Sequence, residues 1–198
     1  MRPIPEDDAF AVAVAQLAAL NVRPEFLLRE APAPARLAPS TLAVTVEMAD
    51  PESDLASGRF VLLHDPDGVD EWGGSFRAVV FVRAQVESDL IDDALLTDVA
   101  WSWVEEVIAL RSCHVTHLGG TVTRSSGRSF GTLSDRPGEG HLEIRASWTP
   151  SDDSAGHLVD SIAVHAEAWL DLVGQAAGLP PIPPGVAVVD QRRRRVRS

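Results

Sequence analysis

Short segments in which apolar and polar residues alternate follow one another along much of the chain, joined by links rich in Gly, Pro, Asp and Ser. Residues 42–48 show the pattern most clearly, with Leu, Val, Val and Met at every second position. Alternation of period two predicts a strand with one buried face. We expect five such strands, at residues 42–48, 59–64, 76–85, 113–124 and 141–148.

Three other segments have apolar residues at the spacing of a helix, three and four residues apart. Residues 9–20 form an Ala-rich run that follows Pro5 and three acids, which favours a helix start. Residues 88–110 and 156–177 predict two longer helices with wide apolar faces. Between the first helix and the first strand, residues 24–40 contain several prolines, which predict an extended surface connector.

This order of elements predicts a single α+β domain over residues 1–185. We expect a mostly antiparallel sheet of about five strands, with helices packed on one face. The other face should be polar and open to solvent or a partner, because it carries Thr45, Glu47, Arg77, Arg83, Glu143 and Arg145. Residues 186–198 then form a C-terminal extension.

All 17 basic residues are Arg, and 29 acids give the chain a net charge of −12. The extension ends in an Arg-rich tail that contains Arg192, Arg193, Arg194, Arg195 and Arg197. Residues 1–190 hold the other 12 Arg and all 29 acids, a net charge of −17. So acidic a body disfavours nucleic-acid binding, which needs a positive face. RNA association through the tail remains an alternative, because a short cationic segment can bind RNA electrostatically.

Cys113 is the only cysteine, so no intramolecular disulfide can form. This cysteine usage fits a reducing cytoplasm, where we expect the protein to reside. The apolar run at residues 9–20 is too short to span a bilayer, and it follows acids where a signal peptide has positive charge. We therefore expect no contact with a membrane.

Cys113, His114 and His117 come closest to a metal-binding cluster, because thiolate and imidazole are zinc ligands. On a strand, however, Cys113 and His117 would lie roughly 13 Å apart at ~3.3 Å per residue, too far for one ion. We expect no metal and no cofactor. The sequence also lacks a recognisable nucleophile motif, so we assign no catalytic residue. The alternative is an enzyme whose pocket uses Cys113, His117 or His165.

The link at residues 65–74 gathers four carboxylates around Gly68 and ends with Trp72 and two glycines. Oxygen-rich loops bind calcium, but this one lacks the full spacing and terminal Glu of an EF-hand. We expect a solvated acidic hairpin, with Trp72 folded back onto the sheet.

A second link, residues 125–140, concentrates Ser and Arg within an acidic body. Guanidinium and hydroxyl groups together can bind a phosphate or a carboxylate. The link is not a phosphate-binding Walker loop, because no Gly-Lys-Ser/Thr follows. Its candidate ligand-binding residues are Arg124, Ser125, Ser126, Arg128 and Arg136, together with Arg145 on the next strand.

Several segments resemble those of an uncharacterised actinobacterial family classed as a domain of unknown function. The resemblance is carried by Gly119–Arg124, by Phe130-Gly131, by the Arg-Ala-Ser-Trp-Thr-Pro segment at 145–150 and by the Pro-rich stretch at 176–185. It implies an actinobacterial, cytoplasmic setting, which the Lys-free composition also favours. It implies no activity, substrate or catalytic residue.

The sequence therefore favours a non-enzymatic cytoplasmic binding or adaptor module. We expect it to bind a protein partner or a small anion through the polar sheet face and the Ser/Arg hairpin. The oligomeric state stays open.

Overall fold

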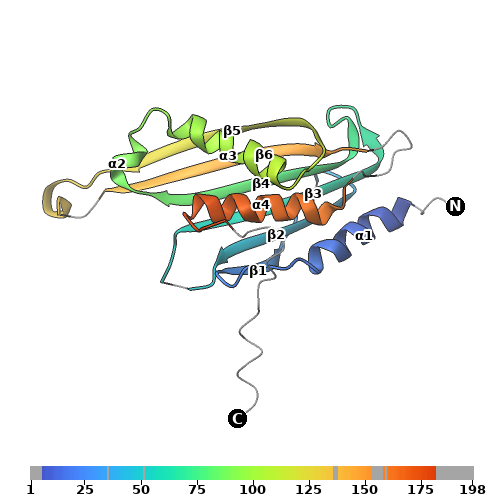
Figure 1. Ribbon diagram of the computed structural model, residues 1–198, viewed down its shortest axis with the longest axis horizontal. Coiled ribbons are helices and arrows are strands. Elements are labelled where there is room, and N and C mark those ends of the chain that lie inside the picture. Colours follow the sequence, from blue (N-terminus) through green and yellow to red (C-terminus); the bar gives the residue numbers. More distant parts are fainter. Residues whose placement is uncertain are drawn as a thin grey trace, which may run out of the picture.

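Six strands form one antiparallel sheet in the order β1-β2-β3-β4-β6-β5 (Figure 1). The computed structural model describes residues 6–34, 36–50, 52–135, 138–152, 158 and 160–181. The strands are β1 (Phe26–Ala31), β2 (Ser40–Met48), β3 (Ala56–Val69), β4 (Gly74–Val86), β5 (Val115–Gly127) and β6 (Glu139–Pro150). The helices are α1 (Glu6–Ala18), α2 (Ser88–Ile91), α3 (Leu96–Leu110) and α4 (Ile162–Ala176), with a 3-10 turn, η1 (Gly131–Leu133).

The α+β class and the antiparallel sheet are confirmed, but the sheet has six strands rather than about five. The additional strand, β1, lies inside the segment that we expected to be an extended connector. Its residues pair with β2 from Phe26 opposite Met48 to Ala31 opposite Ala43, and Phe26 is buried in the core. Pro32 follows directly and, lacking a backbone N–H, limits the strand to six residues.

Helices α1, α3 and α4 all cover the same face of the sheet, with α4 in the middle (Figure 1). Helix α4 packs on β3 and β4 and is flanked by α1 and α3. The core between these layers contains the fully buried rings of Trp148, Trp169 and Phe60. Among the described residues, no helix is long and apolar enough to cross a membrane.

An ion-pair group ties α3 to α4 at the end of α3. The Arg111 guanidinium lies 2.6 Å from an Asp171 oxygen and 2.7 Å from a Glu167 oxygen. The contact with Asp171 is bidentate, a geometry that favours Arg over other cations. Hydrogen bonding to Asp171 raises the pKa of Arg111 against the opposing effect of burial.

Two expected helices differ in extent from the prediction. The segment 88–110 is interrupted after α2, because the Asp93 carboxylate accepts a hydrogen bond of 2.9 Å from the Leu95 N–H and turns the chain. The last helix begins at Ile162 and not near 156, and Leu158 forms an isolated antiparallel bridge with Asp152. Residues 156, 157 and 159 of the expected helix lie outside the described part of the chain.

The opposite face of the sheet is not wholly open as expected. A second apolar cluster lies there, formed by Ala43, Val61 and Leu63 with Trp72, Val79 and three Ala residues of the segment 31–38 packed around it. Trp72 thus folds back onto the sheet, as predicted. The Arg59 guanidinium also donates to the Pro32 carbonyl and holds the Pro-rich segment over this corner. On this same face, the part formed by β4, β6 and β5 remains polar.

Candidate functional site

The hairpin between β5 and β6 projects beyond the end of the sheet (Figure 1). Its tip is a defined turn. Gly131 has a φ of +64°, a left-handed conformation that glycine adopts without strain, and the Ser134 N–H donates a hydrogen bond of 3.1 Å to the Gly131 carbonyl. Phe130 is 74% exposed and Leu133 is 46% exposed on this turn. The Arg128 guanidinium lies 5.8 Å from the centre of the Phe130 ring, within the range of a cation–π contact. We call Arg128, Phe130 and Leu133 the hairpin tip.

The predicted ligand-binding residues of this region do not converge on one point. Arg124 donates to the carbonyls of Ile91, at 3.1 Å, and of Asp93, so its guanidinium anchors the end of α2. Ser125 and Ser126 are exposed near the end of β5. Arg136 lies outside the described residues, as does the whole Arg-rich tail.

Arg145 lies on β6, on the polar face of the sheet. Its guanidinium pairs with Glu143 at 2.9 Å and lies 5.4 Å from the centre of the Phe81 ring. An exposed pair of this kind contributes little to stability. The Glu143 carboxylate nevertheless occupies the position beside Arg145 where an anion would otherwise bind.

Phe130 and Leu133 are the residues of this region that the sequence reading missed. The Ser, Gly and Arg content of the link 125–140 points to anion binding and does not single out these two residues. The signal that was present is a pair of large apolar residues inside an otherwise polar turn, far from any alternating or helical pattern.

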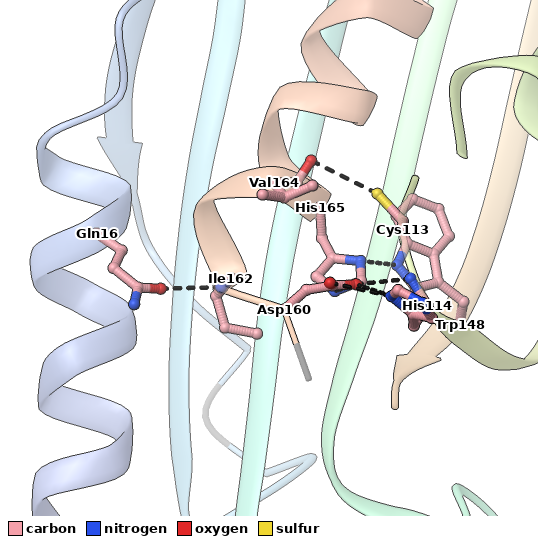
Figure 2. Close-up of polar contacts among 8 residues, drawn as sticks. All are labelled: Gln16, Cys113, His114, Trp148, Asp160, Ile162, Val164 and His165. Atoms are coloured by element: carbon pink, nitrogen blue, oxygen red, sulfur yellow. Dashed lines mark hydrogen bonds and ion pairs between the residues drawn. The ribbon is translucent and has the colours of Figure 1, made fainter. Parts of the chain in front are cut away.

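A second group of functional side chains lies where α4 begins, between β6 and the start of β5 (Figure 2). His165 is fully buried, and its Nδ1 accepts a hydrogen bond of 3.2 Å from Trp148 Nε1. Because Nδ1 accepts, the neutral ring must carry its proton on Nε2. Nε2 has no hydrogen-bond partner among the described residues and lies 3.9 Å from an Asp160 oxygen. Burial lowers the pKa of His165 to about 4.

Asp160 lies between His165 and His114, the residue that precedes β5. Its carboxylate accepts the His114 backbone N–H at 2.6 Å and lies 3.1 Å from His114 Nδ1 (Figure 2). Burial raises the pKa of Asp160, but the hydrogen bonds from His114 outweigh it and hold the pKa below its ordinary value. On the other side, Gln16 of α1 accepts the Ile162 N–H at 2.8 Å and so caps α4 from a neighbouring helix.

Cys113 lies beside the same group, and its thiol has low reactivity. Its Sγ lies 3.8 Å from the Val164 carbonyl oxygen and donates a weak hydrogen bond to it. Burial raises the pKa of the thiol to about 12, so the nucleophilic thiolate is nearly absent at neutral pH.

The structure does not bring Cys113, His117 and His165 together. His117 sits at a bulge of β5 with φ +52°, its ring lies against Gly73 of the β3–β4 turn, and its carbonyl accepts from Arg77. No group of three or more His, Cys, Asp or Glu side chains in the described ranges is arranged to hold a metal ion. The group at the start of α4, made of His114, Trp148, Asp160 and His165 with Cys113 beside it, has the geometry of a polar contact that holds α4 against β5 and β6.

A family model described as "Protein of unknown function (DUF3000)" matches residues 6–187 of the chain. Neither the search of curated proteins nor the search of solved structures gave a match. The match covers every strand and helix described above.

Proposed function

We propose that this chain, which belongs to the DUF3000 family of proteins of unknown function, is a non-enzymatic binding module whose hairpin tip engages a protein partner. The observation that carries the proposal is the 74% exposure of Phe130 on an ordered, projecting turn. Burying a phenylalanine side chain releases about 2 kcal/mol, and a folded protein gains nothing by holding one in water. Aromatic and Arg residues are also the usual anchors of protein interfaces.

The side chains of the hairpin tip indicate what kind of surface the partner would need. Phe130 and Leu133 require an apolar pocket, and Arg128 beside the ring favours carboxylates at the rim of that pocket. The polar part of the sheet face lies next to the hairpin along β5 and β6 and extends the contact area. Apolar anchors surrounded by polar groups are the ordinary anatomy of a protein interface.

A protein partner is favoured over a small anion. Of the predicted anion ligands, Arg124 is already hydrogen-bonded to two carbonyls and Arg145 to a carboxylate. A small anion would have to compete with these partners. A protein partner needs only the side chains that the tip leaves exposed.

We also propose a cytoplasmic setting in an actinobacterium. A single cysteine with a half-buried, protonated thiol suits a reducing compartment. The Lys-free, Ala-rich and Pro-rich composition suits a genome of high GC content. RNA association through the Arg-rich tail stays a separate prediction, since those residues lie outside the described part of the chain.

The test is site-specific photocrosslinking in the native host. A photoreactive phenylalanine analogue replaces Phe130 in one strain and Leu110, an equally apolar residue exposed on α3, in another. We expect one protein to crosslink through position 130 and not through position 110. With that protein purified, Phe130→Ser should weaken binding at least tenfold, whereas Leu110→Ser should leave it unchanged.

Two results would contradict the proposal. One is an identical crosslinking pattern at positions 130 and 110, which would mean that the contacts are random collisions. The other is an affinity that Phe130→Ser does not change, which would place the interface elsewhere. Circular dichroism of both variants checks that neither substitution unfolds the protein.

A further inference from the structure

The strand β5 forms one edge of the sheet, and its outer side has no partner strand among the described residues. From Gly119 to Gly127 it pairs with β6 in unbroken register over nine positions. The backbone N–H and C=O groups on the outer side of such a segment form a template for another strand. Apart from Arg124, the exposed residues of this segment are Gly, Thr and Ser, which are small enough to leave this backbone accessible.

The opposite edge of the sheet is protected in the usual ways. Strand β1 has only six residues, carries exposed Arg29 and Glu30, and ends at Pro32. Short length, charge and proline are the devices by which soluble proteins prevent pairing at an edge. Between Gly119 and Gly127, β5 is longer than β1 and contains no proline. Its single charged residue, Arg124, is turned toward the carbonyls of α2.

Charge also singles out this edge. The chain carries −12 overall, so most pairs of surfaces from two copies would repel each other. Strand β5 contains no carboxylate. Pairing two β5 strands therefore brings no carboxylate of one β5 strand against a carboxylate of the other.

The sequence of the edge is complementary to itself. In an antiparallel pair with a twofold axis through Val122, Thr121 of one copy lies opposite Thr123 of the other, and the reverse. Threonine pairs across strands are favourable, and both residues share the open face of the sheet. On the helix face, Ile144 pairs with Val122, so the row continues through the second copy's Val122 and Ile144 as one apolar line.

The residues that flank the paired threonines on β6 are also complementary in charge. Arg145 is the β6 neighbour of Thr121, and Glu143 is the β6 neighbour of Thr123. Each row across the axis therefore starts at an Arg of one copy and ends at a Glu of the other. We infer that the protein is a homodimer in which the β5 edges of two copies pair antiparallel around Val122 and form a continuous twelve-stranded sheet, following from the six strands of each copy.

This dimer does not depend on the proposed function, but it would determine where the two hairpin tips lie relative to each other. Two antiparallel β5 strands direct the two hairpin tips toward opposite ends of the joint sheet. One dimer thus presents two tips, and a partner with repeated pockets would bind with increased avidity.

Disulfide trapping tests the register. Residues opposite each other in an antiparallel pair have Cα atoms about 4.5–5.5 Å apart, inside the range of a disulfide. We expect Val122→Cys, in a Cys113→Ser background, to form a covalent dimer under mild oxidation. The control is Thr116→Cys, an exposed position on the same strand, whose two copies would lie about 40 Å apart at ~3.3 Å per residue.

Charge substitution tests the contact without a crosslink. Thr121→Lys with Thr123→Lys brings like charges face to face across the axis, and sedimentation should show a monomer whose circular dichroism spectrum is that of the folded wild type. Its thermal midpoint should fall and no longer depend on protein concentration, because it loses the stability that association adds. Thr121→Glu with Thr123→Lys brings opposite charges face to face, and the dimer should persist. A wild-type monomer at every concentration, or a dimer that survives the Lys pair, would overturn the inference, as would equal crosslinking at positions 116 and 122.

Discussion

Trp148 Nε1 donates a hydrogen bond of 3.2 Å to His165 Nδ1, and this bond joins β6 to α4 inside the core. The bond exists only while Nδ1 is unprotonated, because an imidazolium would present a second donor to the indole N–H. Folding therefore selects one protonation state and one tautomer of His165. The stability of the protein becomes coupled to pH through a residue that solvent does not reach.

The sign of this coupling follows from the pKa of His165, which is about 4 in the folded protein against 6.5 as its ordinary value. The lowered pKa contributes stability above pH 6.5 that is lost as pH falls toward 4. The full loss corresponds to about 3 kcal/mol. Urea denaturation at several pH values across this window should show the decline.

The control for this prediction is His165→Gln, which keeps an acceptor for Trp148 but does not titrate. It should be less stable than the wild type at pH 7 and should lose less stability between pH 6.5 and 4. Equal slopes in the two proteins would show that other groups carry the pH dependence. Asp160 acts in a lower range, since its lowered pKa contributes stability that is lost below about pH 4.

We expect the Cys113 thiol to react slowly in the native protein. With a pKa of about 12 in place of 9.0, it holds roughly a thousandfold less thiolate at pH 8. Iodoacetamide labelling followed by mass spectrometry should therefore accelerate sharply when urea unfolds the chain. A Ser134→Cys, Cys113→Ser variant, with its thiol on the exposed turn, should react quickly both with and without urea. Fast native labelling of Cys113 would contradict a raised thiol pKa at this half-buried position.

A methyl group at Gly58 should destabilise the fold by about 1–3 kcal/mol through overpacking. The added Cβ would lie 2.8 Å from Val173 Cγ2 and 2.9 Å from Trp169 Nε1, where α4 approaches β3 most closely. Gly119→Ala is the matched control, because its Cβ meets nothing within 4 Å and its φ is not positive. Chemical denaturation should separate the two, and equal effects would argue against close packing at Gly58.

Arg124→Gln should loosen α2 while leaving the global free energy of unfolding almost unchanged. The substitution removes the guanidinium hydrogen bonds to the carbonyls of Ile91 and Asp93, and the Leu96 N–H, 3.2 Å from the Asp93 carbonyl, remains as a partner for Asp93 alone. Hydrogen exchange should therefore increase at the amides of residues 90–96. Arg128→Gln, which removes a guanidinium from the hairpin tip, should leave those amides protected. Unchanged exchange in the Arg124 variant would show that the anchor is not needed.

The sheet could be predicted from the sequence because alternation survives at each of its five longer strands. Strand β1 could not, since only Phe26 of its six residues is buried and the prolines that follow obscured it. Its structure depends on pairing with β2, a contact between residues that sequence patterns do not relate. The break between α2 and α3 depends on one Asp93 hydrogen bond, and neither Gly nor Pro marks it.

For the candidate site, composition drew attention to the Arg and Ser residues of the β5–β6 hairpin, whereas the structure draws attention to Phe130 and Leu133. A count of Arg and Ser does not show that Arg124 points toward α2, because that depends on where α2 lies. Nor does it show that Phe130 faces water, since a Phe in a loop usually packs against the body. Exposure is a property of the folded chain, so the hairpin tip appears only in three dimensions.

Helix α4 covers the centre of the sheet, yet it comes after all six strands in the chain. A ribosome that adds ~5–20 residues per second needs roughly 1–5 s to pass from the end of β6 to the end of α4. During those seconds the sheet face under Trp169 has no cover, and the nascent chain offers chaperones a broad apolar surface. Translation speed through residues 151–176 thus sets how long each new molecule is exposed to aggregation.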